Sequence, residues 1–201
     1  MKINRGMSLL MIVFLSAAVS SCGGKKIERI DASETKDLSG RWNDTDSRLV
    51  AEEMIKTSLS KPWLERFKSD KGRAPVIITY GVKNRSSEHI NTQTFMKDLE
   101  GAFVDSGEVD VVADKDQQKQ IRGEQADQNA GFTADPVQIG KELGADFVLT
   151  GVLNTITDQE GKEAVIFYQT NLELIGVETS KKVWIGSKKI KKYISRAKMN
   201  F

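Results

Sequence analysis

The chain has 201 residues, of which 39% are hydrophobic and 29% charged, as expected for a globular domain with one sizeable core. Lys2 and Arg5 account for the formal net charge of +2, so the rest of the chain carries 28 basic and 28 acidic residues. Such a balance argues against the strongly basic surface that nucleic-acid binding requires, and the single cysteine excludes an internal disulfide.

The amino-terminal segment has the features of an export signal. Lys2 and Arg5 precede an apolar run over residues 7–18, which is shorter than the roughly 20 residues of a spanning helix. Val19-Ser20-Ser21-Cys22 resembles a bacterial lipobox, which implies removal of residues 1–21 and attachment of lipid to Cys22. An ordinary signal peptide with an accidental cysteine, or a short membrane helix, is the alternative.

Residues 22–45 are polar and lack apolar periodicity, so they are interpreted as a flexible tether. A segment of roughly 20 residues reaches at most about 70 Å when fully extended. The remaining residues, 46–201, are expected to form a single globular domain.

The domain begins with two predicted helices, over residues 46–59 and 60–72. Apolar side chains recur at an interval of four and therefore share a helix face: Ala51, Ile55 and Leu59 in the first helix, Trp63 and Phe67 in the second. The residues that suit the caps and first turns are Asp46 or Ser47, then Ser60 with Pro62.

The centre of the chain predicts a buried strand over 74–82, a loop over 83–89, and a helix from Asn91 or Thr92 to about Ser106. A short strand over 109–112 follows. The polar segment from Asp114 to 131 is open to two interpretations, a solvated helix or a mobile loop. A further short helix is predicted over 135–144, with Asp135 as cap and Pro136 in its first turn.

Three strands are predicted at the carboxyl end, over 147–156, 164–175 and 183–192. Short polar connections join them, so they should form an antiparallel meander. In the middle strand every second residue is apolar or small, and these residues share one face: Ala164, Ile166, Tyr168, Thr170, Leu172 and Leu174. The fold expected is α/β (α+β), a mixed sheet of about five strands flanked by helices.

The sequence offers little for catalysis or for a bound cofactor. His89 is the only histidine and has no cysteine or histidine partner with which to hold a metal ion. Neither GxxxxGK[ST] nor GxGxxG occurs, so no phosphate-binding loop is indicated. Neighbouring carboxylates such as Asp114 and Asp116, or Glu52 and Glu53, are common among 28 acids and have no diagnostic spacing. No cofactor and no metal are expected.

Two places are candidate docking sites. Asn84 and Arg85 follow the first strand, at a carboxyl end where the sites of such sheets gather, although Asn84 also suits a turn that binds its own backbone. The last strand carries Lys188 and Lys189 among other lysines. Edge lysines can discourage strand addition, or they can form a docking surface for an acidic partner.

Four segments resemble the LpoB-type penicillin-binding protein activators, whose domain is similar to the amino-terminal domain of TolB and to CsgG. They are DTDSRLVAEEMI (44–55), VIITYGVKNRSSEHINT (76–92), IGKELGADFVL (139–149) and LELIGVETSKKVWIGS (172–187). Their order after a lipobox is more specific than any one of them. The resemblance implies a TolB-like sheet and a non-enzymatic function.

The same resemblance implies a lipoprotein of the outer membrane, with its domain facing the periplasm. The domain is expected to be a monomer. Its partner would be a class A penicillin-binding protein, a peptidoglycan synthase that it activates. Gly23 after Cys22 favours the outer membrane by resemblance to lipoprotein sorting. A structural or secretion-associated lipoprotein of the CsgG or TolB kind is the alternative.

Overall fold

The computed structural model describes residues 27–137 and 142–195, and the chain divides into two units, residues 1–34 and 35–201. In the described part of the first unit, Ile27 and Ile30 are exposed, and the Asp31 carboxylate accepts the backbone N–H of Ser33 at 2.7 Å. The predicted export signal and Cys22 lie outside the described residues. All helices and strands that the structure describes belong to the second unit.

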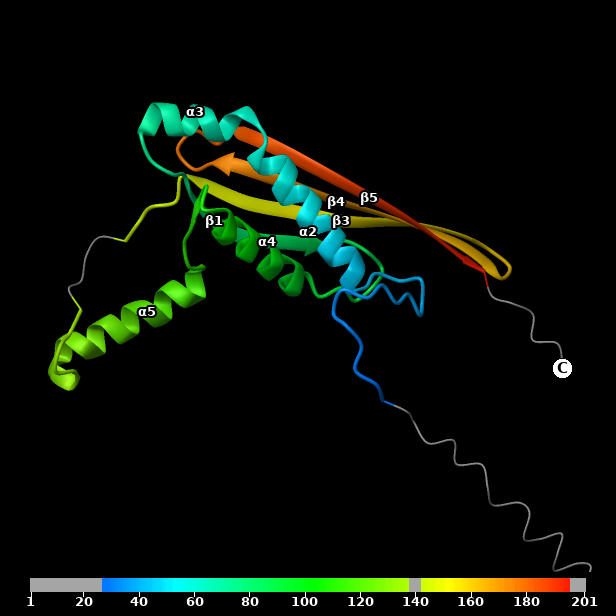
Figure 1. Cartoon of the computed structure of the whole chain (residues 1–201), viewed down its shortest axis with the longest axis horizontal. Helices are drawn as coiled ribbons and strands as arrows, with labels where there is room; N and C mark the ends of the chain where they lie inside the picture. The colour runs from blue at the N-terminus through cyan, green and yellow to red at the C-terminus, as the bar shows by residue number, and fades with distance from the viewer. Residues whose placement is uncertain (1–26, 138–141, 196–201) are drawn as a thin grey trace, which may run out of the picture. The chain divides into compact units, whose positions relative to one another are not determined.

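A mixed sheet of five strands forms the centre of the second unit, in the order β2-β1-β3-β4-β5 (Figure 1). β1 is parallel to both β2 and β3, whereas β3, β4 and β5 are antiparallel neighbours. The predicted fold class and the carboxyl-terminal meander are therefore confirmed. The strands are β1 (Val76–Asn84), β2 (Asp110–Val111), β3 (Phe147–Glu160), β4 (Glu163–Gly176) and β5 (Lys182–Ser195).

The last three strands are longer than predicted because their connections are shorter. Gly161 and Lys162 alone join β3 to β4, and Gly161 has a φ of +57°, which suits a tight hairpin. Every second residue of β4 from Ile166 to Leu174 is buried, as the alternation predicted. These buried side chains define one face of the sheet as its core face.

Helices α2, α3 and α4 cover that core face. α2 (Asp44–Leu59) packs against β5, and α4 (Thr92–Ser106) packs against β1 and α2 (Figure 1). α3 (Pro62–Lys71) contributes Trp63 and Phe67, whose rings contact Phe147 edge-on at 5.3 Å. None of the helices in the described part of the chain is long and apolar enough to span a bilayer.

The ends of the first helices differ from the prediction. α2 is capped by Asn43 rather than by Asp46 or Ser47, because Asn43 and Asp46 form a reciprocal capping box. Ser60 does not cap α3. It closes α2 instead, and Lys61 precedes Pro62 without a side-chain bond to the helix. α4 begins after Asn91, whose side chain accepts the N–H of Gln93, as predicted.

The polar segment that begins at Asp114 forms α5 (Lys115–Asp127), so its helical interpretation is confirmed. No residue of α5 is buried, and a short π-helical turn, η1 (Gln128–Phe132), follows it. The helix predicted over 135–144 is not present where the structure describes this stretch, at 135–137 and 142–144. Val137 and Leu143 are exposed there, so the apolar spacing did not signify packing against a core.

Residues 37–43, which the sequence assigned to the tether, contact the sheet and are called the strap. The Asp37 carboxylate and the Arg41 carbonyl both accept hydrogen bonds from Lys192 Nζ at 3.0 Å. Gly40 has a φ of +68°, and a Cβ there would lie 2.5 Å from Ile194 Cγ1. Only glycine therefore suits this close approach.

Candidate functional site

The loop after β1 is shaped by the side chain of Asn84. Its Oδ1 accepts the backbone N–H of Ser86 at 2.9 Å, and its Nδ2 donates to the carbonyl of Glu88 at 2.8 Å. Asn84 is therefore engaged within the loop, as expected of an Asx turn. The fold of the loop fixes the position of Glu88.

Glu88 connects the loop to the strap and to the core through hydrogen bonds. The hydroxyl of Tyr168 on β4 donates to Glu88 Oε1 at 2.6 Å, and the backbone N–H of Trp42 donates to Oε2 at 3.2 Å. The Trp42 ring contacts Tyr168 edge-on at 5.5 Å. Burial, together with the nearby Glu88 carboxylate, raises the pKa of Tyr168 well above its ordinary value. The phenol is therefore held as a neutral hydrogen-bond donor.

Arg85 is exposed and makes no ion pair with any described residue. Its backbone N–H donates to the carbonyl of Leu153 at 2.8 Å, which extends the β1–β3 ladder one residue past the pair Asn84–Leu153. Side chains alternate along a strand, and Leu153 belongs to the core face. Arg85 therefore lies on the opposite face, beside Asn154. This second face is not covered by α2, α3 or α4, although Lys115 of α5 lies over the Tyr80 ring at its β1 end, 5.2 Å from the centroid. It is called the open face.

The lysines of β5 fall into two groups by the same alternation. Lys188 and Lys192 are on the core side, where Lys188 pairs with Glu53 at 2.9 Å and Lys192 pairs with Asp46 at 2.7 Å. Burial alone would lower the pKa of Lys192, but the carboxylates of Asp46 and Asp37 outweigh it and leave that pKa raised. These two lysines fasten α2 and the strap to the sheet.

Lys189 and Lys191 are on the open face, where both are exposed and neither pairs with an acid in the described residues. The strand register places Lys189 opposite Gln169, and Gln169 opposite Asn154. Arg85 continues this row at the β1 end, so one row of side chains crosses four strands. At roughly 4.8 Å per strand, Arg85 and Lys189 are about 14 Å apart along the sheet.

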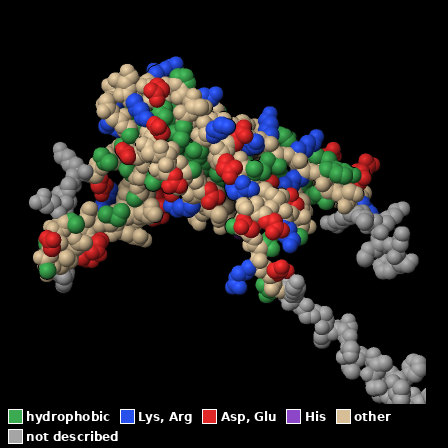
Figure 2. All heavy atoms as spheres, viewed as in Figure 1, with side chains coloured by type: hydrophobic (Ala, Val, Ile, Leu, Met, Phe, Trp, Pro, Cys, Tyr) green, Lys and Arg blue, Asp and Glu red, His purple; other side chains and the backbone are tan. Residues whose placement is uncertain are grey.

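Five side chains together are called the basic belt: Arg85, Asn154, Gln169, Lys189 and Lys191. The belt joins the two candidate sites of the sequence analysis, the loop after β1 and the last strand, on one face. It contains three cations, two amides and no acid. By contrast, Figure 2 shows charges of both signs interspersed over α2, α3 and α4. A belt of this kind suits an acidic protein surface.

The acids noted in the sequence have structural partners. Asp114 caps α5 by accepting the backbone N–H groups of Asp116 and Gln117, and Glu52 pairs with Arg48 at 3.1 Å. His89 is exposed. Within residues 27–137 and 142–195, no three His, Cys, Asp or Glu side chains gather where they could hold a metal ion.

A family model of the peptidoglycan-synthase activator LpoB matches residues 46–190. The chain belongs to the LpoB family. The match runs from α2 to β5 and includes Arg85, Asn154, Gln169 and Lys189, while Lys191 follows it directly. None of the curated proteins matches the chain.

Solved structures match the chain at low identity, among them two LpoB domains and another bacterial lipoprotein. The carboxyl-terminal domain of LpoB from Salmonella enterica is 19% identical, with a TM-score of 0.36, over 64% of this chain and 93% of that one. The corresponding Escherichia coli domain is 19% identical, with a TM-score of 0.35, over 67% and 94%. Lipoprotein GNA1162 from Neisseria meningitidis is 15% identical, with a TM-score of 0.40, over 62% and 88%.

Sequence reasoning found both ends of the belt in this LpoB-family domain but missed its centre. Asn154 and Gln169 are polar positions that alternate with buried residues of β3 and β4, so alternation alone could have assigned them to an exposed face. The contacts of Glu88 with Tyr168, 80 residues later in the chain, have no local sequence signal.

Proposed function

We propose that this chain is an outer-membrane lipoprotein, anchored through Cys22 and facing the periplasm, that activates a class A penicillin-binding protein. The observation that carries the proposal is the match of residues 46–190 to the synthase-activator family. The chain acts without catalysis of its own, as a monomer, by binding the synthase and raising the rate at which it polymerises glycan strands.

The basic belt is the proposed docking surface. Arg85, Lys189 and Lys191 lack acidic partners in the described residues, so an acidic surface of the synthase can pair with them without displacing an internal ion pair. Such charge complementarity chiefly speeds association and sets specificity. Lys188 is already paired with Glu53 of α2, so its charge holds that helix to β5 and is not available to the partner.

The anchor raises the effective concentration of the domain near its partner. Because the strap contacts the sheet, the length free to act as a tether is residues 23–36, which reach at most about 50 Å when extended. The reach of the tether is therefore expected to limit activation. Insertion of roughly 20 flexible residues after Gly24 should preserve or improve function in the cell.

The direct test is glycan polymerisation from lipid-linked precursor by each class A synthase of the same cell, with and without the full chain. The proposal expects a faster rate for at least one synthase and no polymer from the chain alone. An unchanged rate with every synthase would refute it.

A second experiment tests the anchor. Cys22→Ala should leave the domain folded but move it from the membrane fraction to the soluble fraction, and the mutant should fail to complement a deletion strain. Complementation by the unlipidated protein at native expression would show that the anchor is incidental.

A further inference from the structure

Exposed apolar side chains gather on the open face. Among the described strands, the large apolar side chains that are 37–67% exposed are Tyr80, Ile156, Val183, Ile185 and Tyr193. All of them lie on the open face by the alternation of their strands. A single exposed apolar residue is ordinary on a protein surface, whereas a contiguous group marks a surface that binds a protein or a membrane.

Part of this apolar surface is continuous and borders the basic belt. Ile156 pairs with Phe167 and Phe167 pairs with Lys191, so these side chains form one row across three strands. The next row towards the β3–β4 turn pairs Val165 with Tyr193, and both Val165 and Phe167 are partly exposed. The four side chains Ile156, Phe167, Val165 and Tyr193 are called the apolar patch. Only about 7 Å along the strands separate it from the row of the belt that crosses four strands.

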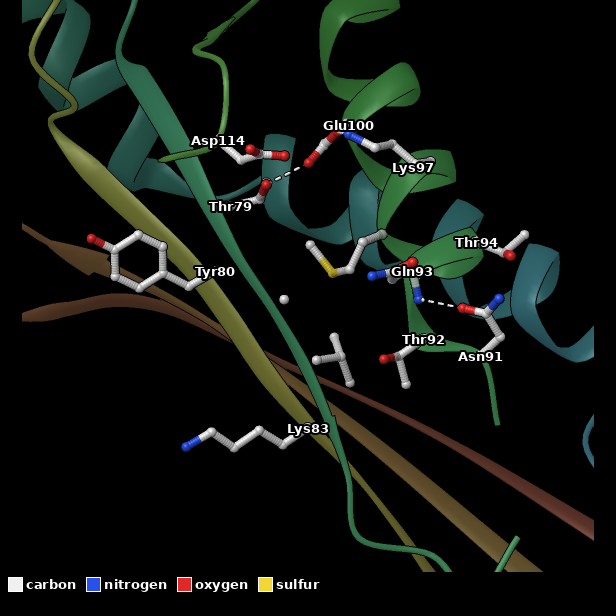
Figure 3. A pocket seen from close by; sticks show the side chains of 13 residues that line it. Thr79, Tyr80, Lys83, Asn91, Thr92, Gln93, Thr94, Lys97, Glu100 and Asp114 are labelled. Carbon is white, nitrogen blue, oxygen red and sulfur yellow. Dashed lines mark hydrogen bonds and ion pairs between the residues drawn. The ribbon is translucent and has the colours of Figure 1, made fainter. Parts of the chain in front are cut away.

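β1 adds an aromatic ring and a further cation to the open face. In the close view of the pocket between β1 and α4, the side chains of Tyr80 and Lys83 extend from β1 to the side away from α4 (Figure 3). Lys83 is exposed and, like the cations of the belt, has no acidic partner in the described residues. The apolar side chains of the open face therefore lie among four such cations: Lys83, Arg85, Lys189 and Lys191.

The acids that β3, β4 and β5 place on the open face are either paired or distant from the belt. Glu173 pairs with Lys182 at 2.7 Å. The remaining acids lie towards the tip of the hairpin, near the β3–β4 turn: Asp158, Glu160 and Glu163. Glu163 accepts the hydroxyl of Tyr193 there at 2.7 Å. Beside the basic belt, therefore, the unpaired charges of these strands are all positive.

The tether joins the domain at the edge of this face. β5 is an edge strand of the sheet, and Lys192 on it donates to Asp37 at the start of the strap. The chain neighbours of Lys192, which are Lys191 and Tyr193, have their side chains on the open face. The tether reaches at most about 50 Å, whereas β1 and β5 are about 14 Å apart across the sheet. A bilayer that holds Cys22 is therefore within reach of the whole belt.

We infer that the open face rests on the anionic surface of the bilayer in which Cys22 is anchored. The side chains of the apolar patch enter the headgroup region, and the cations of the belt pair with lipid phosphates. The acids at the hairpin tip are repelled by the same surface, so the sheet tilts with its belt towards the bilayer. The inference rests on the lipid anchor of the proposed function and adds a regulation to it, because the bilayer and the synthase compete for the same cations.

The anchor makes a weak contact sufficient. A small apolar patch with a few cations binds a bilayer only reversibly, but attachment through Cys22 keeps the domain at a high effective concentration near the surface. An anionic bilayer also offers both kinds of contact at once, phosphates for the cations and an apolar interior for the patch. A second copy of the chain that aligned its belt with this one would instead bring like charges together.

The test uses the lipidated full chain in vesicles of phosphatidylcholine, with or without phosphatidylglycerol. Cys22 is the only cysteine and carries the lipid, so Ile156→Cys adds a single free thiol for an environment-sensitive fluorophore. Val104→Cys is the matched control, at a position of α4 that is 58% exposed. Emission from the label at residue 156 should shift to the blue in anionic vesicles and return towards its value in water at high salt. No shift at residue 156, or an equal shift at residue 104, would overturn the inference.

Charge variants locate the contact. Lys189→Glu combined with Lys191→Glu should abolish the shift of the label at residue 156. Lys56→Glu combined with Lys61→Glu changes the net charge equally at two exposed positions on the helical side and should retain the shift. Loss of the shift in both double variants would contradict a contact through the belt. A shift that grew with the density of protein on the vesicle would assign the face to a second copy and overturn the inference. The vesicles contain no synthase, so failure here would leave the proposed activation standing.

Discussion

The two faces of the sheet are made by the same strands and differ in what covers them. On the core face, Leu149, Tyr168 and Leu174 are fully buried beneath α2, α3 and α4. On the open face, Ile185 and Tyr193 remain 61% and 64% exposed, beside the basic belt. The alternation of each strand therefore places neighbouring residues in different settings, the buried core on one side and the exposed face proposed for docking on the other.

Truncation of one side chain on each face should give the largest difference in stability between the two faces. Leu174→Ala leaves a cavity in the core and should lower the free energy of unfolding by about 2–5 kcal/mol. Ile185→Ala on the open face should change it by less than about 0.5 kcal/mol. Urea unfolding followed by tryptophan fluorescence measures both. Similar losses in the two variants would show that the open face is covered in solution.

The lysines of β5 give a matched pair within one strand. Lys192→Ala removes the partner of Asp46, whose side chain is 6% exposed, and should cost about 1–3 kcal/mol of unfolding free energy. Lys189→Ala should cost nothing measurable, since it has no acidic partner in the described residues. A destabilised Lys189 variant would remove the distinction between structural and surface lysines.

Low pH should affect the two faces differently, because the basic belt contains no carboxyl group to protonate. Burial alone would raise the pKa of Asp146, but the ion pair with Arg73 at 2.7 Å and the N–H of Val76 at 2.8 Å outweigh it and lower that pKa. The resulting stability is present above the ordinary value of 3.8 and is lost as the pH falls through the lowered pKa in the folded state.

Asp146→Asn should therefore be less stable than the parent protein at neutral pH, and the difference should shrink at about pH 3. Asp158→Asn, at an exposed position of β3, is the matched control and should behave like the parent. The measurement is the unfolding free energy of the parent and both variants at each of the two pH values. A constant difference between Asp146→Asn and the parent would show that the ion pair is not its cause.

The smallest effect concerns the centre of the belt. Gln169→Ala should weaken binding to the synthase about fivefold, the value of one hydrogen bond of about 1 kcal/mol, without changing stability. Titration of the labelled domain with the synthase gives the affinity. An affinity equal to that of the parent would confine docking to the charged ends.

The core face could be predicted from sequence because its signals are local. The alternation from Ile166 to Leu174 and the spacing of Trp63 and Phe67 both led to buried residues or to aromatic contacts of the core. The open face depends on register between strands that are far apart in the chain. Nothing near Arg85 indicates that it lies in a row with Lys189, because four strands must pair first.

Two failures of prediction have the same physical origin. Residues 37–43 are polar, and their attachment relies on Lys192, some 150 residues later. Residues 135–144 have helical spacing, but the described Val137 and Leu143 contact no core. In both cases the outcome depended on a tertiary contact, which the strap makes with Lys192 and which Val137 and Leu143 lack in the described structure, rather than on the local pattern.

The most direct test of the account pairs stability with function in one variant. Arg85→Glu combined with Lys189→Glu reverses the charge at both ends of the belt, and Lys162→Glu is the control. The measurement is stimulation of glycan polymerisation by the class A synthase, together with the unfolding free energy of each variant. The account predicts that the double variant loses stimulation while its unfolding free energy stays within about 0.5 kcal/mol of the parent. Full stimulation by the double variant would contradict it.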